Sequence, residues 1–201
     1  TDFINWVRNG ADATGVDLTE QGVALVNERL VLEDLRAEVV VADAENLPFA
    51  DATFDIVYSY GVLHHSPNTR KAIDEVYRVL KPGGRARIMI YHLRSVTGVV
   101  LWGLHCAAKL RPWKSPRWAI FNHLESPGTK AYTTEEARRL FLAYRRVDIR
   151  TVLGPGDLLL MPPSAKYQTW YFQVPWKLYP RRVIRRLGDR FGLGMLIEAE
   201  R

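Results

Sequence analysis

Short runs of β-branched and aromatic residues alternate along the first 91 residues with longer segments in which apolar residues recur at helical spacing. The run at 38–42 is continuously β-branched, which is typical of a parallel strand buried on both faces. Strands that alternate with helices of ten or more residues predict βαβ units and an α/β fold. The predicted strands lie at 13–17, 38–42, 54–59 and 85–91, and the predicted helices at 3–9, 21–31 and 68–80.

The stretch Lys81-Pro82-Gly83-Gly84 lies between the third predicted helix and the strand at 85–91. Pro82 cannot continue a helix, and Gly83 and Gly84 can take positive φ, so the stretch predicts a tight turn into a buried strand.

Together with Phe54-Asp55-Ile56-Val57-Tyr58-Ser59 and Leu63-His64-His65, this turn resembles the passage into the fifth strand of class I S-adenosylmethionine-dependent methyltransferases. The likeness is greatest to the small-molecule branch that includes the ubiquinone and menaquinone biosynthesis enzymes, and it covers residues 1 to about 91. It implies a Rossmann-like doubly wound sheet, mostly parallel, with an antiparallel last strand. It also implies S-adenosylmethionine as cofactor and methyl transfer to a small-molecule acceptor.

The first residues, Thr1-Asp2-Phe3, have the pattern of a capped helix start. In the resembled family the first strand and its Gly-rich turn come immediately before such a segment. We therefore expect an N-terminally truncated domain whose upstream sequence holds that strand and turn. We also expect the chain alone to expose two interior sheet edges, bind the cofactor weakly and be poorly active.

The second half of the chain follows the family only in outline, and a single domain with three parts is predicted. A Trp-rich, basic stretch begins after His92, with a helix expected at 96–110 and an irregular lid at 111–130. Thr133-Thr134-Glu135-Glu136 predicts a capped helix start. The parts are a cofactor-binding half at 1–92, a lid or acceptor insertion at 93–132, and C-terminal helices with the last two strands, at 147–152 and 195–199, in 133–201.

Carboxylates follow two of the predicted strands. Asp17 stands at the carboxyl end of a strand, where α/β sheets bind ligands and a carboxylate can accept both hydroxyls of a ribose; a capping or loop aspartate is the alternative. The resemblance implies that Asp17 binds the ribose, that Asp43 and the Ala44 amide contact adenine, and that 59–61 lie beside the methionine half. The implied cofactor-binding residues are Asp17, Leu18, Asp43, Ala44, Glu45, Ser59, Tyr60 and Gly61.

His64 and His65 are the catalytic candidates, since they follow a strand on the side where the acceptor is expected. A base is needed only if the acceptor carries a proton, and a structural role is the more common one for a histidine there. His92, Lys130 and Tyr132 are the candidates for acceptor binding, with a surface loop and a packed Tyr132 as the alternative. The wide spacing of His92, His105 and His123 predicts no metal site.

Charge and composition add little to this assignment. The net charge of +6 gathers in arginine pairs that are usually solvated helix faces. The pairs at 181–182 and 185–186, near Trp170 and Trp176, also suit an anionic membrane surface or an acidic partner, and contact with a peripheral membrane or a lipid-like substrate is the corresponding expectation. No nucleic-acid-binding motif accompanies the charge, so no nucleic-acid partner is predicted. The single Cys106 and the absence of a signal-peptide pattern favour a cytoplasmic setting.

Two other classes of function remain open at this point. Asp17 after a strand also suits an NAD-dependent Rossmann oxidoreductase, although the 81–84 turn and the Asp43-Ala44 segment favour the methyltransferase. A non-catalytic, methyltransferase-like binding module is the third possibility.

Overall fold

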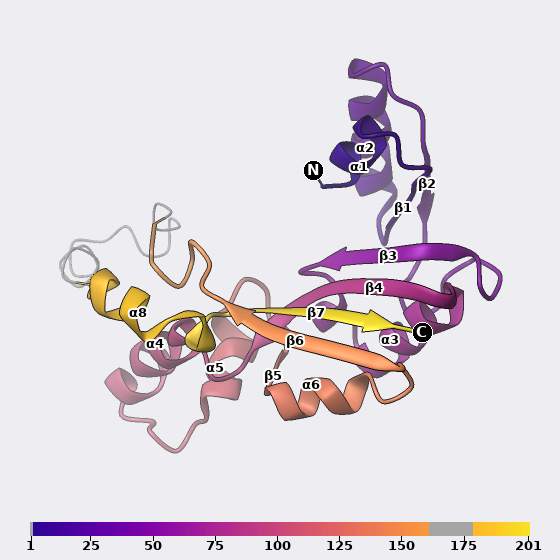
Figure 1. The fold of residues 1–201 in the computed structure, drawn as a ribbon. Coiled ribbons are helices and arrows are strands. Elements are labelled where there is room, and N and C mark those ends of the chain that lie inside the picture. Colours follow the sequence, from indigo (N-terminus) through magenta and orange to yellow (C-terminus); the bar gives the residue numbers. More distant parts are fainter. Residues whose placement is uncertain (1, 161–178) are drawn as a thin grey trace.

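The computed structural model describes residues 2–160 and 179–201 (Figure 1), and the predictions made for Trp170 and Trp176 lie outside these residues. The elements fall into two groups. We call residues 2–41 the amino-terminal unit and residues 54–160 with 179–201 the main unit. The amino-terminal unit consists of α1 (Asp2–Arg8), β1 (Thr14–Asp17), α2 (Glu20–Leu32) and β2 (Glu38–Val41).

In the amino-terminal unit, β1 pairs in parallel with β2, with Asp17 opposite Val41. Thr19 begins α2 as its N-cap, because its side chain accepts from the Gly22 amide at 3.0 Å. A small core of three buried residues, Ile4, Val7 and Leu30, holds the two helices to the strands. The predicted elements at 3–9, 13–17, 21–31 and 38–42 are thus confirmed to within a residue or two.

The main unit is built on a larger sheet of order β3-β4-β7-β6, with the short β5 beside β4. In Figure 1, helices α3, α5 and α6 lie beneath this sheet. Its core contains fourteen buried residues, Phe141, Ile90 and Met195 among them. The elements are β3 (Phe54–Tyr60), α3 (Thr69–Val79), β4 (Leu80–His92), α4 (Val96–His105), α5 (Pro116–His123), β5 (Ala131–Tyr132), α6 (Thr134–Leu140), β6 (Arg146–Val152), α8 (Arg181–Leu187) and β7 (Gly194–Glu200).

Strand β7 runs antiparallel to both β4 and β6, whereas β3 runs parallel to β4. The mostly parallel α/β sheet with an antiparallel last strand is therefore confirmed, as are the two last strands. The expected helix start at Thr133 is also confirmed, because Thr133 and Glu136 form a complete capping box. None of the described helices has the length and apolar character that a bilayer crossing requires.

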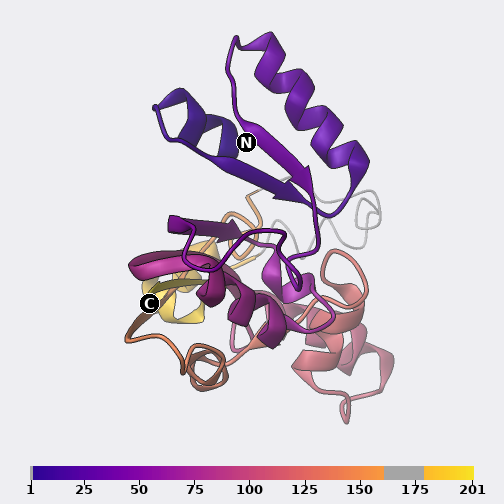
Figure 2. The ribbon, with the colours of Figure 1, turned by 90° about the vertical axis from the view of Figure 1, so that its right-hand side faces the viewer.

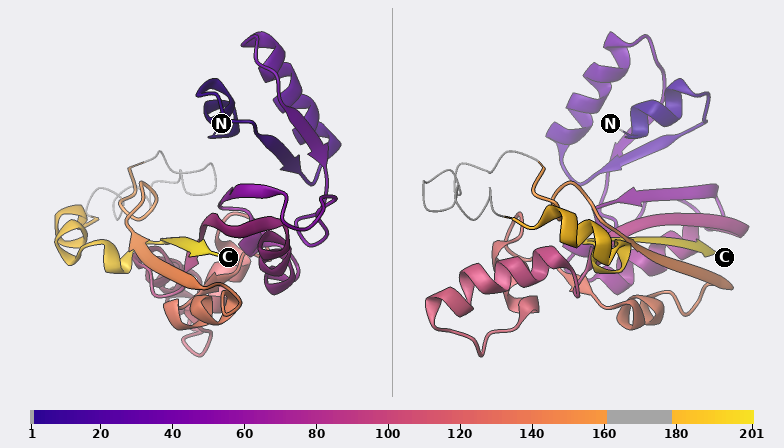
Figure 3. Two further views of the ribbon diagram at one scale, coloured as in Figure 1. Left: turned by 45° about the vertical axis from the view of Figure 1, so that its right-hand side comes forward. Right: turned by 60° about the vertical axis from the view of Figure 1, so that its left-hand side comes forward.

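The edges of β1 and β3 face each other without a strand between them among the described residues. Figures 2 and 3 show β1 as the strand of the amino-terminal unit nearer to β3. Contrary to the burial predicted for 38–42, Val41 is 48% exposed, and in β3 the side chains of Ile56 and Tyr60 are 46% and 52% exposed.

Three other local predictions need correction. The 81–84 stretch is not a turn before the strand: β4 already begins at Leu80, and the stretch forms a bulge opposite Asp55, with Gly83 at φ 77°. The expected helix at 96–110 ends at His105, and Leu110 takes φ 55°. The supposedly irregular lid contains α5, because Ser115 caps the helix and Pro116 occupies its first turn, where proline is favourable.

Candidate cofactor and acceptor site

Asp17 ends β1 with its carboxylate over the first turn of α2. Oδ1 of Asp17 accepts hydrogen bonds from the amide and the hydroxyl of Thr19, both at 2.8 Å. A Cβ added to Gly22 would stand 2.4 Å from this oxygen, so only glycine leaves room for the carboxylate there. The Asp17 carboxylate is half-buried and held in place, and Leu18 beside it is 69% exposed.

Asp43 lies next to Asp17 because the Ala42 amide donates to the Asp17 carbonyl at 2.9 Å. Oδ1 of Asp43 accepts from the Glu45 amide at 2.9 Å, which shapes the turn that follows β2. Glu45 in turn accepts from the Asn68 amide at 2.6 Å, at the N-terminus of α3. The predicted ribose and adenine residues are therefore brought together at one end of the two-stranded sheet.

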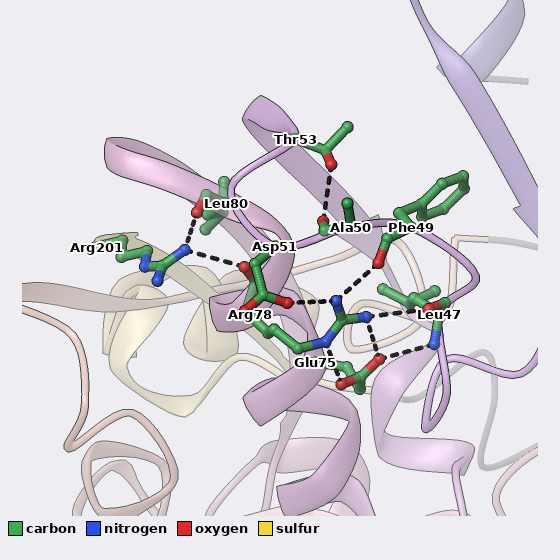
Figure 4. A network of polar contacts seen from close by, with 9 residues as sticks. All are labelled: Leu47, Phe49, Ala50, Asp51, Thr53, Glu75, Arg78, Leu80 and Arg201. Carbon is green, nitrogen blue, oxygen red and sulfur yellow. Dashed lines mark hydrogen bonds and ion pairs between the residues drawn. The ribbon is translucent and has the colours of Figure 1, made fainter.

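Arg78 of α3 ties the loop after Asp43 to the main unit (Figure 4). Its guanidinium donates to the Phe49 carbonyl at 2.7 Å and to the Leu47 carbonyl at 3.0 Å. Glu75 accepts from Arg78 at 2.7 and 2.8 Å and from the Leu47 amide at 2.8 Å. The Arg78 guanidinium holds the pKa of Glu75 below its ordinary value, so the pair is ionised at neutral pH.

The end of β3 provides the third group of predicted cofactor residues. Gly61 takes φ 78°, and its amide donates to the Met89 carbonyl at 3.1 Å. The hydroxyl of Ser59 is buried without a hydrogen-bond partner in the described structure, and Tyr60 is half exposed. A left-handed glycine beside an unpaired hydroxyl suits close approach of a polar ligand.

His64 and His65 follow in a 3-10 turn (Leu63–His65) and differ in their surroundings. His64 is fully buried, its ring 4.1 Å from that of Tyr91 between centroids, and neither ring nitrogen has a partner in the described structure. Burial, with smaller effects of His65 and Lys130, lowers the pKa of His64 to about 3. Nε2 of His65 lies 3.3 Å from Oε2 of Glu125, in a partly open position.

The predicted acceptor residues are only partly brought together. Lys130 reaches the turn after His65, where Nζ donates to the carbonyls of Ser66 and Pro67. Tyr132 is half-buried and its burial raises its pKa. His92 is buried, and its Nδ1 lies 3.2 Å from the Gly192 carbonyl. Gly192 precedes β7, which pairs with β4 on the edge opposite to β5. Burial lowers the pKa of His92, so its ring is neutral at pH 7.

A cleft of about 340 Å³ lies between α1 and β3, lined by Asp2, Asn5, Trp6, Asn9 and Tyr58. None of the predicted site residues lines it. The hydroxyl of Tyr58 donates to Asp2 at 2.7 Å across this cleft, which joins the two units at one point.

Sequence reasoning missed three residues that shape these sites: Gly22, Arg78 and Glu125. Gly22 lies five residues after Asp17 and within the first turn of a helix, and this position could have indicated from the sequence that it makes room for the Asp17 carboxylate. Arg78 contacts Phe49, about 30 positions away along the chain, and Glu125 contacts His65, about 60 positions away, so no local sequence pattern predicts their roles.

Comparison with known proteins finds sequence matches in the first part of the chain. Residues 3–88 match the family described as the methyltransferase domain. The sterol 4-C-methyltransferase strm-1 of Caenorhabditis elegans is 37% identical over 86 residues, which are 42% of this chain and 25% of that protein. The 27-O-demethylrifamycin SV methyltransferase of Amycolatopsis mediterranei is 40% identical over 79 residues, 38% of this chain and 29% of that protein.

The matching segment thus spans between a quarter and a third of each of these relatives. A solved structure extends the likeness in fold over almost the whole chain. The Thermotoga maritima protein described as an S-adenosylmethionine-dependent methyltransferase, possibly a histamine N-methyltransferase, aligns with a TM-score of 0.58 at 19% identity. It covers 97% of this chain and 75% of its own. At this identity the likeness shows the fold, which is that of the class I methyltransferases.

Proposed function

We propose, from the methyltransferase domain that residues 3–88 carry, that this chain takes part in transferring a methyl group from S-adenosylmethionine to a small-molecule acceptor. The observation that carries the proposal is the pair of carboxylates, Asp17 and Asp43, at the ends of two neighbouring parallel strands. The hydrogen bond from Ala42 to the Asp17 carbonyl fixes their separation. The carboxyl ends of parallel strands are where open α/β sheets bind nucleotides.

In this proposal the cofactor lies across both units. Asp17 accepts from the ribose hydroxyls, and Gly22 allows its carboxylate to stay in place. Asp43, with the Ala44 amide, binds the adenine edge, while Leu18 and Glu45 flank it. Ser59, Tyr60 and Gly61 face the methionine half, where the unpaired Ser59 hydroxyl gains a partner.

When bound, the cofactor supplies a methyl group already activated as a sulfonium, so the protein's contribution is mainly to position donor and acceptor. Lys130, Tyr132 and His92 remain our proposed acceptor-binding residues, and His64 and His65 the proposed residues nearest the reacting atoms. A lipid-like acceptor is in keeping with the sterol named for one relative. A cytoplasmic setting is proposed on the single cysteine, Cys106, which is free and buried.

Calorimetric titration with S-adenosylhomocysteine, the product form of the cofactor, tests the proposal. We expect weak binding by this chain and stronger binding by a version extended upstream, and in either one Asp17→Ala should weaken binding by about 1.5–3 kcal/mol, the range for a hydrogen bond to a charged group. Asp12→Ala is the matched control, because Asp12 precedes the same strand without ending it, and it should leave binding unchanged.

The same titration separates the other classes of function. Binding of NADH with none of S-adenosylhomocysteine would identify an oxidoreductase and contradict the proposal. Binding of S-adenosylhomocysteine that Asp17→Ala leaves intact would place the cofactor elsewhere on the molecule.

A further inference from the structure

His64 and His65, proposed above as the residues nearest the reacting atoms, form a three-residue cluster with Glu125 to which no ligand has been assigned. One nitrogen of each ring and one oxygen of the carboxylate lie within 4.8 Å of one another. The three side chains come from the turn after β3 and the loop after α5, about 60 residues apart. We propose that this cluster is a binding site for a divalent transition-metal ion, with Zn²⁺ the best match. This proposal does not depend on the cofactor proposed above.

The ligand set is the first argument. Two imidazoles and one carboxylate are the donors of many zinc sites in which water or substrate occupies a fourth position. With zinc–ligand bonds of about 2.0–2.2 Å, tetrahedral geometry separates two ligand atoms by about 3.3 Å. Nε2 of His65 and Oε2 of Glu125 are 3.3 Å apart, so these two already have the spacing of a ligand pair.

The state of His64 is the second argument. Its ring is fully buried, and both nitrogens lack a hydrogen-bond partner in the described structure. Burying a polar atom without a partner is unfavourable, so such an atom calls for an explanation. A metal ion would give one of these nitrogens the partner that it lacks in the described structure.

The hydrogen bonds around His65 are the third argument. The Thr129 hydroxyl donates to the Ser126 carbonyl at 2.8 Å, so toward Nδ1 of His65, at 3.4 Å, it can only accept. This places the proton of a neutral His65 on Nδ1 and a lone pair on Nε2, facing the Glu125 carboxylate. Two electron-rich atoms at this distance need a cation between them, either a proton or a metal ion.

Glu125 is also oriented for such a role. The Tyr91 hydroxyl donates to its Oε1 at 2.5 Å, leaving Oε2 toward His65. Hydrogen bonds of this kind, which orient a ligating carboxylate or imidazole, are a regular feature of metal sites. The backbone of Glu125 takes φ 53°, a conformation that a non-glycine residue adopts rarely and often at functional positions. Half of its side chain is exposed, so an ion has a path in.

The experiment measures how much zinc the chain retains. The chain is stripped of metal with a chelator, reloaded with Zn²⁺ alone and dialysed, and the same procedure with Co²⁺ gives a second probe that is visible by its absorption. We expect one equivalent of zinc per chain and the intense visible absorption of tetrahedral cobalt. Glu125→Gln and His65→Asn should each lower affinity at least tenfold. Glu20→Gln, an exposed carboxylate on α2, and His123→Gln, from the stacked His105–His123 pair, should leave affinity unchanged.

Glu125→Gln keeps the acceptor for Tyr91, so its fold is expected to survive, and a thermal melt of each variant verifies this. Retention of zinc that Glu125→Gln and His65→Asn do not reduce would overturn the proposal. So would a failure of the folded, stripped and reloaded chain to retain zinc or to give the cobalt absorption.

Discussion

The two units of the molecule differ in how they are held together. Three buried residues form the core of the amino-terminal unit, against fourteen in the larger core of the main unit. The sheet of the amino-terminal unit has only two short parallel strands, and a two-stranded sheet has little stability of its own. In the main sheet each central strand is hydrogen-bonded to at least two neighbouring strands. Much of the proposed cofactor site, Asp17 and Leu18 directly and Asp43 just after β2, therefore depends on the weaker part.

Few contacts connect the amino-terminal unit to the main unit. The Tyr58–Asp2 hydrogen bond crosses the cleft, and the ring of Trp6 lies 5.9 Å from that of Tyr58. The loop after β2 is held to α3 through Arg78 and Glu75. A region with few buried apolar contacts opens at lower free energy than a well-packed core, so we expect the units to unfold separately.

The largest effect expected is on the core of the main unit. Phe141 is fully buried, and Phe141→Ala should lower the free energy of unfolding by about 3–5 kcal/mol and remove the main thermal transition. Leu30→Ala, in the core of the amino-terminal unit, should instead abolish hydrogen-exchange protection in β1 and β2 and leave β4 protected. Equal loss of protection in β4 would show that the two units unfold as one.

A smaller effect is expected where the loop after β2 meets α3. Arg78→Ala removes the donors to the Phe49 and Leu47 carbonyls and should weaken S-adenosylhomocysteine binding by about 1.5–3 kcal/mol without moving the main thermal transition. Arg70→Ala is the matched control, because Arg70 lies on the same helix but donates to the Leu140 carbonyl, away from the loop. An equal loss of binding in both variants would contradict a specific role for Arg78.

The smallest effect is a pH dependence of the same loop. The folded-state pKa of Glu75 is lowered, chiefly by its hydrogen bonds from Arg78, so its contribution to stability is present above the unfolded value. It declines as the pH falls below about 4.3 toward the lowered pKa. Exchange protection of the Leu47 amide, which donates to Glu75, should fall over that interval. Glu75→Gln should show no such change; a change that persists would assign it to another group.

Sequence periodicity predicted most elements of both units, because each depends on local spacing and on caps such as Thr19 and Thr133. It overestimated the burial of β2, since the exposure of a strand's side chains depends on which distant elements pack on its two faces, and no local pattern encodes that. It also predicted an irregular lid at 111–130, where α5 begins at Pro116.

The candidate site divides in the same way. Asp17, Asp43 and Gly61 were found because strand ends are visible in the sequence. Glu125 was not, because its partner His65 is brought to it only by the packing of α5 and β5 against β4.

The unpaired hydroxyl of Ser59 and the clamped carboxylate of Asp17 stand on different units, so a molecule that binds both links two unfolding equilibria into one. Order in the amino-terminal unit then becomes a function of ligand concentration. At a hundredfold excess over the dissociation constant, a ligand adds about 2.7 kcal/mol to the stability of the state that binds it, comparable to a well-packed core side chain. The cell's supply of that ligand would then set how much of the chain is folded at any moment.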